Sequence, residues 1–394
     1  MTSYHCRRFY LIPIVAIGFS FLFSSPVKAQ TNPGGDLVGN KSLAVILFNF
    51  SDDVRRPFLK ADVEAKTFTD TDSVSAYWRE VSFNKLNLTG KVFDWVKIPL
   101  KKPVCSNMDD QAKIIEDASQ LAKTVIATAR AAGYDYYVLA APQFCLKIPD
   151  ARVGGFFVPG TNFIFFNDNQ FYKVFETVHE LGHAFGLGHA NALDCHISHG
   201  YGKNGRATFS ATLPGADNTL CQSVGYSDPV SVMGNFSPGN SLGSKEPPHI
   251  SAFQKMALGW LDQATVQTIV KSGTYEIQPT EIFSRQGVIR VPIDRGRFSL
   301  IFDLTGFFNP TDQLYYYLDY RTPFGGVRVF IGKDFAPIPV APTIATLALS
   351  QTYLVDVTPS LPQNLFDAVI KPGNPFEDIE RKIMSAVTDS GNEI

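Results

Sequence analysis

The sequence predicts an α+β fold. A domain with a twisted, mixed and mostly parallel sheet comes first, and a β-rich, sandwich-like domain follows it. Apolar runs alternate with helical patterns in the first part of the chain, and short β-prone runs fill the rest. The 394 residues exceed one ordinary core, while 45% hydrophobic and 18% charged residues describe a folded globular protein. We place the first domain at 43–263 and the second at 264–394.

The first domain begins with a continuous apolar run, Leu43–Phe50, which is typical of a strand covered on both faces. The next elements in chain order are expected to be a helix over Asp70–Ser82 with Thr71 or Asp72 near its start, a strand over Lys85–Leu100 with a bend or bulge at Gly90, a helix over Asp109–Ala132 stopped by Gly133, and a strand over Tyr136–Ala140. This alternation predicts crossover connections and therefore a mostly parallel sheet.

Two short strands and two helices complete the first domain. The strands are expected at Gly155–Val158 and Phe163–Phe166, and Tyr172 opens a helix that carries the main motif. Ser251 to Leu258 predicts a further helix with Ser251 as its N-cap. The β-prone runs of the second domain are Thr274–Ile277, Val288–Val291, Phe298–Leu304, Leu314–Tyr320 and Val327–Ile331.

The N-terminus has the pattern of a secretory leader. Arg7 and Arg8 precede an apolar run from Phe9 to Phe23, and small residues around Ala29 offer a cleavage site. We expect residues 1–29 to be a signal peptide, followed by a short segment over 30–42. An uncleaved anchor is the alternative, although the run is shorter than the about 20 residues of a membrane span. The mature protein is therefore expected to be extracellular or periplasmic.

Charge and cysteine content narrow the class of protein further. Without residues 1–29 the chain keeps 32 basic and 37 acidic residues, a net charge of −5, so no nucleic-acid partner is expected. No later stretch is apolar enough for a stable membrane anchor. Cys105, Cys145, Cys195 and Cys221 remain, and an even count in an exported chain favours two disulfide bonds. Three pairings are open; the favoured one joins the first two and the last two, and free buried thiols are the alternative.

Residues 179–189 read HELGHAFGLGH, and three of the seven histidines of the chain lie within them. On a helix, residues four apart share one face, so His179 and His183 can point at one metal ion. Glu180 is rotated about 100° from His179, which places a base beside the ion instead of on it. The alternative is an amphipathic core helix with surface histidines.

Gly186 extends this motif. A continued helix would point His189 away from the other two, whereas a glycine with positive φ can turn the chain back. His189 then becomes a third ligand, and the fourth position stays open for water and substrate. Three protein ligands with an open position are the catalytic arrangement of Zn²⁺. We therefore expect one catalytic zinc, with Glu180 as general base.

Residues 231–234 read Ser-Val-Met-Gly, some forty residues beyond the third histidine. The extended zinc motif followed by such a methionine resembles the metzincin clan of metalloproteases. Within that clan the chain looks most like gametolysin-like peptidases, through HELGHAFGLGHA, YSDPVSVMG, PPHISAFQKMALGWL, WREVSFNKLNLTG and YYYLDYR. The resemblance covers most of 43–335, although only the zinc motif is highly specific.

The resemblance implies a secreted endopeptidase acting on protein or peptide substrates, with cell-wall or extracellular-matrix glycoproteins as candidates. It places Met233 beneath the histidines as a hydrophobic floor. It also implies a substrate-binding edge strand made of Gly155, Phe156, Phe157 and Val158. The alternative function is a secreted binding or adhesion protein, with weak or no catalysis, on the same scaffold.

The chain departs from some metzincins at two positions. Ala190 follows the third histidine, and Asn235 stands where astacin-like enzymes carry a tyrosine ligand, so any help to the transition state must come from elsewhere.

Two further features have ordinary interpretations. Asp52-Asp53 could bind Ca²⁺, although solvated loop carboxylates are far commoner. Four tyrosines could form a binding face, but strands favour aromatic residues: Tyr315, Tyr316, Tyr317 and Tyr320.

Overall fold

The structure is a computed structural model of the whole chain. It describes residues 7–13, 37–103, 111–144, 155–167, 172–194, 200–201, 207–209, 222–234, 248–262, 266–282, 288–293, 313–321, 325–334, 342–343, 347, 350–355, 365, 368–372, 376–378 and 383–388. Within these residues the architecture is α+β with mixed sheets, as the sequence predicts.

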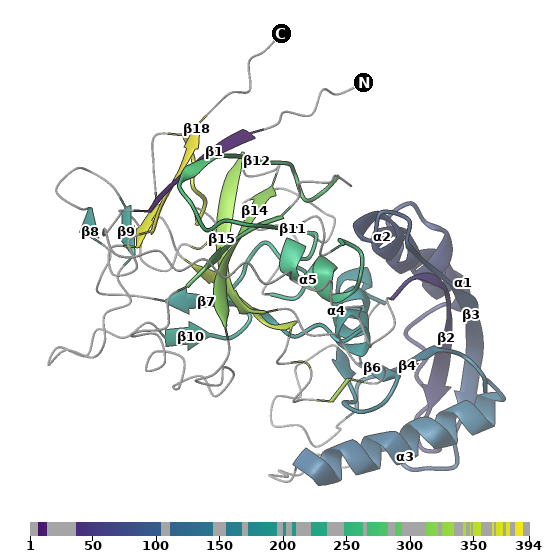
Figure 1. Cartoon of the computed structure of the whole chain (residues 1–394). Helices are drawn as coiled ribbons and strands as arrows, with labels where there is room; N and C mark the ends of the chain where they lie inside the picture. Colours follow the sequence, from purple (N-terminus) through teal and green to yellow (C-terminus); the bar gives the residue numbers. More distant parts are fainter. Residues whose placement is uncertain are drawn as a thin grey trace, which may run out of the picture.

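A five-stranded sheet forms one half of the molecule (Figure 1). Its strand order is β3-β2-β4-β6-β5, and the first four strands are parallel. β5 pairs antiparallel with β6 and lies at the edge, as the family resemblance implies. The bounds are β2 Gly39–Asn49, β3 Leu86–Lys97, β4 Tyr136–Ala141, β5 Gly155–Phe157 and β6 Phe163–Asn167.

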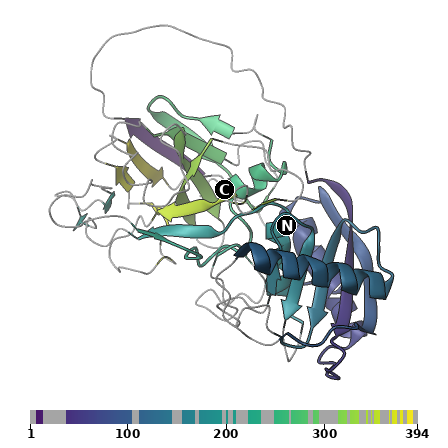
Figure 2. The ribbon, with the colours of Figure 1, turned by 90° about the horizontal axis from the view of Figure 1, so that it is seen from below.

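Both faces of this sheet are covered, which explains the continuous apolar run in β2. Val45 and Leu47 belong to one core, which also contains residues of α2 (Val74–Val81) and α4 (Val174–Ala184). Ile46 and the residues two positions before and after it point to the opposite face, where they pack with α3 in a second core. Figure 2 shows α3, Gln111–Ala129, running across that face of the sheet.

The region before α2 holds a helix that the sequence pattern does not predict. α1, Lys60–Glu64, runs directly into a π-helix, Ala65–Thr69. α2 then starts after Ser73, whose Oγ accepts a hydrogen bond from the amide of Ala76 at 3.2 Å. The helix therefore begins four residues after the predicted start at Asp70, and neither Thr71 nor Asp72 is its N-cap. A serine at this position satisfies a free amide of the first turn.

β3 has a bulge, but not at Gly90. Ile46 pairs with Phe93 whereas Phe48 pairs with Val96, so one residue of β2 faces two of β3. Gly90 has a different role, because a Cβ atom there would lie 1.8 Å from the carbonyl oxygen of Leu43. The glycine permits close approach of the two backbones.

α3 stops before the predicted glycine. Its last residue is Ala129, and Arg130 adopts φ +53°. Gly133 also has positive φ, at +92°, but lies in the following turn. A non-glycine residue in the left-handed region thus ends the helix, which the pattern alone does not indicate.

The other half of the molecule contains two larger sheets. The seven-stranded sheet has the order β10-β7-β16-β15-β14-β13-β11, with bounds Gln222–Val224, Ala190–Asp194, Thr352–Val355, Gly326–Lys333, Leu314–Arg321, Val288–Pro292 and Val266–Thr268. The six-stranded sheet has the order β12-β1-β18-β17-β9-β8, with bounds Gly273–Ile277, Arg7–Pro13, Ile383–Thr388, Phe376–Asp378, Ala207–Phe209 and Gly200–Tyr201.

Four of the predicted C-terminal strands are present as β12, β13, β14 and β15, and the fifth, Phe298–Leu304, lies outside the described residues. The seven-stranded sheet also draws on the first part of the chain, because β7 pairs parallel with β16. A hydrogen-bonded sheet therefore joins residues on both sides of position 264. The domain boundary itself stays a prediction.

The seven-stranded sheet is buried on both faces. Tyr316 and Tyr320 of β14 pack in a core that includes Ile277 of β12. On the other face, Tyr315 and Tyr317 pack against α5, Ala252–Ala257. All four tyrosines are at most 8% exposed, so the alternative of a tyrosine binding face is wrong. α5 itself begins at Ser251, which forms the expected cap.

Part of the predicted leader belongs to a sheet in this structure. Arg7–Pro13 forms β1, which pairs antiparallel with both β12 and β18. Cleavage after Ala29 would remove this strand, and the leader remains a prediction. Among the described residues, no helix combines the length and apolarity needed to cross a bilayer.

Candidate metal centre

α4 carries the first two histidines and ends at a glycine turn. It starts at Val174, two residues after the predicted start. At its C-terminus the amide of Leu187 donates to the carbonyl of Gly182 at 2.8 Å, and that of Gly186 donates to the carbonyl of His183 at 2.9 Å. Gly186 has φ +100°. This is a Schellman motif, and it turns the chain back as the sequence predicts.

The turn brings three histidines together. The ligand nitrogens of His179, His183 and His189 all lie within 4.8 Å of one another, and no other group of three potential ligands occurs in the described part of the chain. The Nε2 atoms of His179 and His183 are 3.1 Å apart. The three side chains could therefore hold one metal ion.

Backbone carbonyls orient two of these rings. His179 Nδ1 donates to the carbonyl of Val232, and His183 Nδ1 donates to that of Leu187, both at 2.7 Å. Each bond fixes the tautomer that leaves Nε2 with a free lone pair, as metal-binding histidines require.

Burial keeps the three imidazoles neutral. It lowers the pKa of His179, lowers that of His183 well below its usual value, and lowers that of His189 to about 3. His189 Nε2 is buried and has no hydrogen-bond partner. A buried nitrogen without a partner next to two converging lone pairs fits a metal ion, which would satisfy all three.

Glu180 lies beside the cluster, against edge strand β5. A Cβ atom on Gly155 would come within 3.1 Å of Glu180 Cγ. Burial raises the pKa of the Glu180 carboxyl to about 8, and a hydrogen bond from the Phe157 backbone partly offsets this effect. A bound dication would lower this pKa, because it favours the charged carboxylate. β5 ends at Phe157, one residue before the predicted end; Val158 follows it, and its amide donates to the carbonyl of Phe163 at 2.9 Å.

Met233 is fully buried beneath α4. A Cβ atom on Gly182 would lie 2.4 Å from its sulfur, so the methionine packs directly against the helix between the first two histidines. The amide of Ala190 donates to the Met233 carbonyl at 2.8 Å. This hydrogen bond connects the turn that contains Met233 to the segment that follows His189.

Residues far along the chain hold the segment that delivers His189. Ser350 Oγ donates to the carbonyl of Gly186 and accepts from the amide of Gly188, both at 2.7 Å. Gln254 of α5 donates to the carbonyl of Gly188 at 3.1 Å. Motif analysis does not identify these two side chains, since neither lies near the motif in sequence.

Tyr226 is a further residue of the site that sequence analysis missed. Its ring centroid is 3.7 Å from that of His189 and 6.0 Å from that of His179. It lies seven residues before Met233 in a segment without helical or strand periodicity. An aromatic residue inside YSDPVSVMG was the only available signal.

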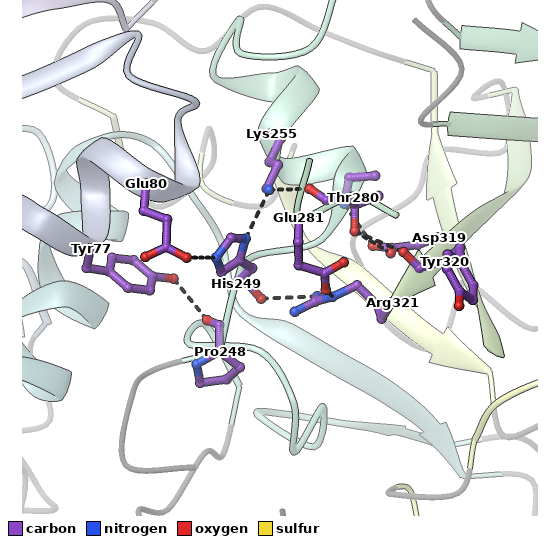
Figure 3. Close-up of polar contacts among 11 residues, drawn as sticks. Tyr77, Glu80, Pro248, His249, Lys255, Thr280, Glu281, Asp319, Tyr320 and Arg321 are labelled. Carbon is purple, nitrogen blue, oxygen red and sulfur yellow. Dashed lines mark hydrogen bonds and ion pairs between the residues drawn. The ribbon is translucent and has the colours of Figure 1, made fainter. Parts of the chain in front are cut away.

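A polar network, buried except at Glu80, joins α2, α5 and β14 around His249 (Figure 3). Glu80 accepts from His249 Nε2 at 3.1 Å, and Lys255 Nζ contacts His249 Nδ1 at 3.2 Å. Arg321 pairs with Glu281 and donates to the His249 carbonyl. Burial lowers the pKa of Lys255 to about 7. His249 is thus part of this network and not of the three-histidine cluster.

Two other predictions, a Ca²⁺ site at Asp52-Asp53 and two disulfide bonds, gain no support from the described residues. Asp53 is bound by the guanidinium of Arg55, and Asp52 accepts from the amide of Lys102 at 2.8 Å, so both carboxylates already have partners. The Ca²⁺ alternative therefore has no further support. All four cysteines of the predicted disulfides lie outside the described residues.

No family model matches this chain, and no curated protein matches it. The functional argument therefore rests on the residues of the site.

Proposed function

We propose that this chain is a secreted zinc-dependent endopeptidase of the metzincin type, similar to gametolysin-like peptidases. His179, His183 and His189 hold the metal, and Glu180 is the general base. One observation carries the proposal: three imidazoles converge next to a buried carboxylate that lies against β5, the last strand of the sheet in the described part of the chain.

The spacing of the nitrogens suits zinc. Two nitrogens at about 2.0–2.1 Å from a tetrahedral Zn²⁺ stand about 3.3 Å apart, close to the 3.1 Å between His179 and His183. Imidazole ligands also suit Cu, Fe and Ni, but three histidines with a neighbouring glutamate favour the hydrolytic chemistry of zinc.

Zinc held by the three histidines would supply Lewis acidity, which would polarise a peptide carbonyl and lower the pKa of a water molecule. Glu180 accepts one proton from that water as its oxygen attacks the carbonyl carbon. Glu180 then delivers the proton to the amide nitrogen, and the C–N bond breaks. The position of Glu180 next to His179 on α4 supports both steps, because a dication bound by the histidines would favour the charged carboxylate that a general base requires.

The edge strand supports an extended peptide as the substrate. β5 pairs with β6 on one side and is the last strand in the sheet order. A peptide can add to such an edge through main-chain hydrogen bonds, which places an internal bond near Glu180. This mode binds the backbone, so it favours extracellular proteins or glycoproteins with exposed loops as the substrate class.

The test compares cleavage of a peptide library by the full chain with and without a zinc chelator. We expect one Zn²⁺ per chain and cleavage that the chelator abolishes. Glu180→Gln should retain zinc and lose nearly all activity, whereas Glu64→Gln, an exposed carboxylate of α1, should match the unaltered chain. Cleavage by Glu180→Gln at the parent rate would contradict the assigned base.

The same experiment addresses the alternative of a secreted binding or adhesion protein. That protein would hold zinc without chelator-sensitive cleavage of any library peptide. Such a result would separate metal binding from catalysis and would exclude the endopeptidase assignment.

A further inference from the structure

The third histidine differs from the other two in how its ring is held. His179 and His183 each donate Nδ1–H to a backbone carbonyl at 2.7 Å. No hydrogen bond joins the ring of His189 to another described residue, and the ring lies against the rings of His179, His183 and Tyr226. His189 also lies beyond the end of α4, where no helix backbone restricts it. Its orientation must therefore come from packing.

Tyr226 supplies the nearest packing contact. Its ring centroid is 3.7 Å from the His189 ring at an interplanar angle of 38°. The other two histidines are more distant, with centroids 4.6 Å and 5.6 Å from His189. Tyr226 also lies parallel to His179 within 17°, so it covers two of the three ligands from one side.

The backbone of Tyr226 shows that this placement is enforced. Its φ is +61°, a strained region that a bulky side chain rarely adopts. The Tyr226 amide donates to the Oδ1 atom of Asn191 at 3.0 Å. Asn191 is buried in β7, two residues after His189. One short segment thus carries both the ligand and the side chain that holds Tyr226 over it.

We propose that Tyr226 is a positioning residue whose ring fixes the His189 imidazole, in place of the hydrogen bond that orients the other two ligands. The contact uses the ring face and not the hydroxyl group. The proposal rests on the proposed metal site. It goes beyond the motif, because the motif specifies three histidines and a glutamate but no partner for the third histidine.

Exposure makes Tyr226 suitable for mutation. It is 47% exposed, so removing the ring leaves no enclosed cavity in the core. Tyr226→Ala removes the contact with His189, and Tyr226→Phe keeps the ring and removes only the hydroxyl. Tyr134→Ala, which deletes a half-buried tyrosine beside Phe93, is the matched control.

Zinc affinity is the first readout, measured by competition with a fluorescent chelator on the full chain. We expect Tyr226→Ala to bind zinc about 10–100-fold more weakly, which is the usual effect of losing a group that orients a ligand. Tyr226→Phe and Tyr134→Ala should bind within about twofold of the unaltered chain. Equal zinc affinity of Tyr226→Ala and the unaltered chain would overturn the proposal.

A Co²⁺-substituted protein supplies the second readout, since its visible spectrum reports ligand geometry. Tyr226→Ala should change the spectrum and Tyr226→Phe should restore it. A changed spectrum in Tyr226→Phe would overturn the proposal, because the hydroxyl would then be the active part. If the unaltered chain binds no zinc, the proposed function fails; if it binds zinc but Tyr226→Ala binds equally well, only the positioning role fails.

Discussion

The strongest structural prediction concerns a buried ion pair between β15 and the segment that precedes Met233. Arg328 of β15 contacts Asp228 at 2.6 Å, and the two side chains are 1% and 0% exposed. Asp228 lies five residues before Met233 and also accepts from the amide of Val230. The pair therefore anchors the segment whose Val232 carbonyl orients the first histidine.

Arg328→Met removes one partner and leaves a carboxylate buried without its counter-ion. Breaking a fully buried pair in this way costs about 3–5 kcal/mol, which is a large share of the about 5–15 kcal/mol that stabilises a typical protein. Adding Asp228→Asn to Arg328→Met should recover more than about 1 kcal/mol, since it removes the uncompensated charge.

Urea unfolding followed by tryptophan fluorescence measures these changes, because Trp78 and Trp260 are fully buried. Lys66→Met is the control: Lys66 lies 2.9 Å from Asp70, but the side chains are 41% and 35% exposed. It should cost less than about 1 kcal/mol, as surface pairs do. A loss below about 1 kcal/mol for Arg328→Met would refute the reasoning.

Two further predictions concern the methionine floor and the buried network. Gly182→Ala should lower the free energy of unfolding by about 1–3 kcal/mol, and Met233→Ala should lower it by about 2–5 kcal/mol. The double variant should lose at least about 1 kcal/mol less than the sum of the two single losses. The reason is that the new methyl group at position 182 fills the space that the methionine side chain leaves. Strict additivity in equilibrium unfolding would contradict the contact. His249 lies between Glu80 and Lys255, and burial lowers its pKa to about 4. Its contribution to the free energy of unfolding is therefore complete above about pH 6.5, the pKa of an unfolded histidine, and is lost as the pH falls from there through 4. In metal-free protein, His249→Gln should therefore flatten the stability profile between pH 6.5 and 4, and parallel profiles for both chains would contradict this.

Local patterns predicted the elements whose cause is local. The apolar run of β2 implied burial on both faces, and alternate residues do face two cores. Ser251 indicated a helix start, and it forms a capping box with Gln254. In each case the signal and the structure involve residues a few positions apart, so periodicity or one side chain is enough to predict them.

Features that depend on residues far away in the sequence were missed or misplaced by the sequence analysis. The bulge of β3 falls near Asp94 because the register with β2 changes there, while Gly90 meets a backbone carbonyl. β7 joins a sheet whose neighbouring strand, β16, starts at Thr352. No period in the sequence records which strands become neighbours, since pairing depends on how the whole chain packs.

The metal centre depends both on local sequence and on residues distant in the sequence. Helix geometry and one glycine with positive φ determined that His179, His183 and His189 can converge, and this follows from eleven consecutive residues. Only the tertiary structure decided what holds those rings, because the Val232 carbonyl and Ser350 reach the motif from positions 53 and 164 residues away. Chemistry encoded in side-chain spacing can be read along the chain, whereas orientation by packing exists only once the chain has folded.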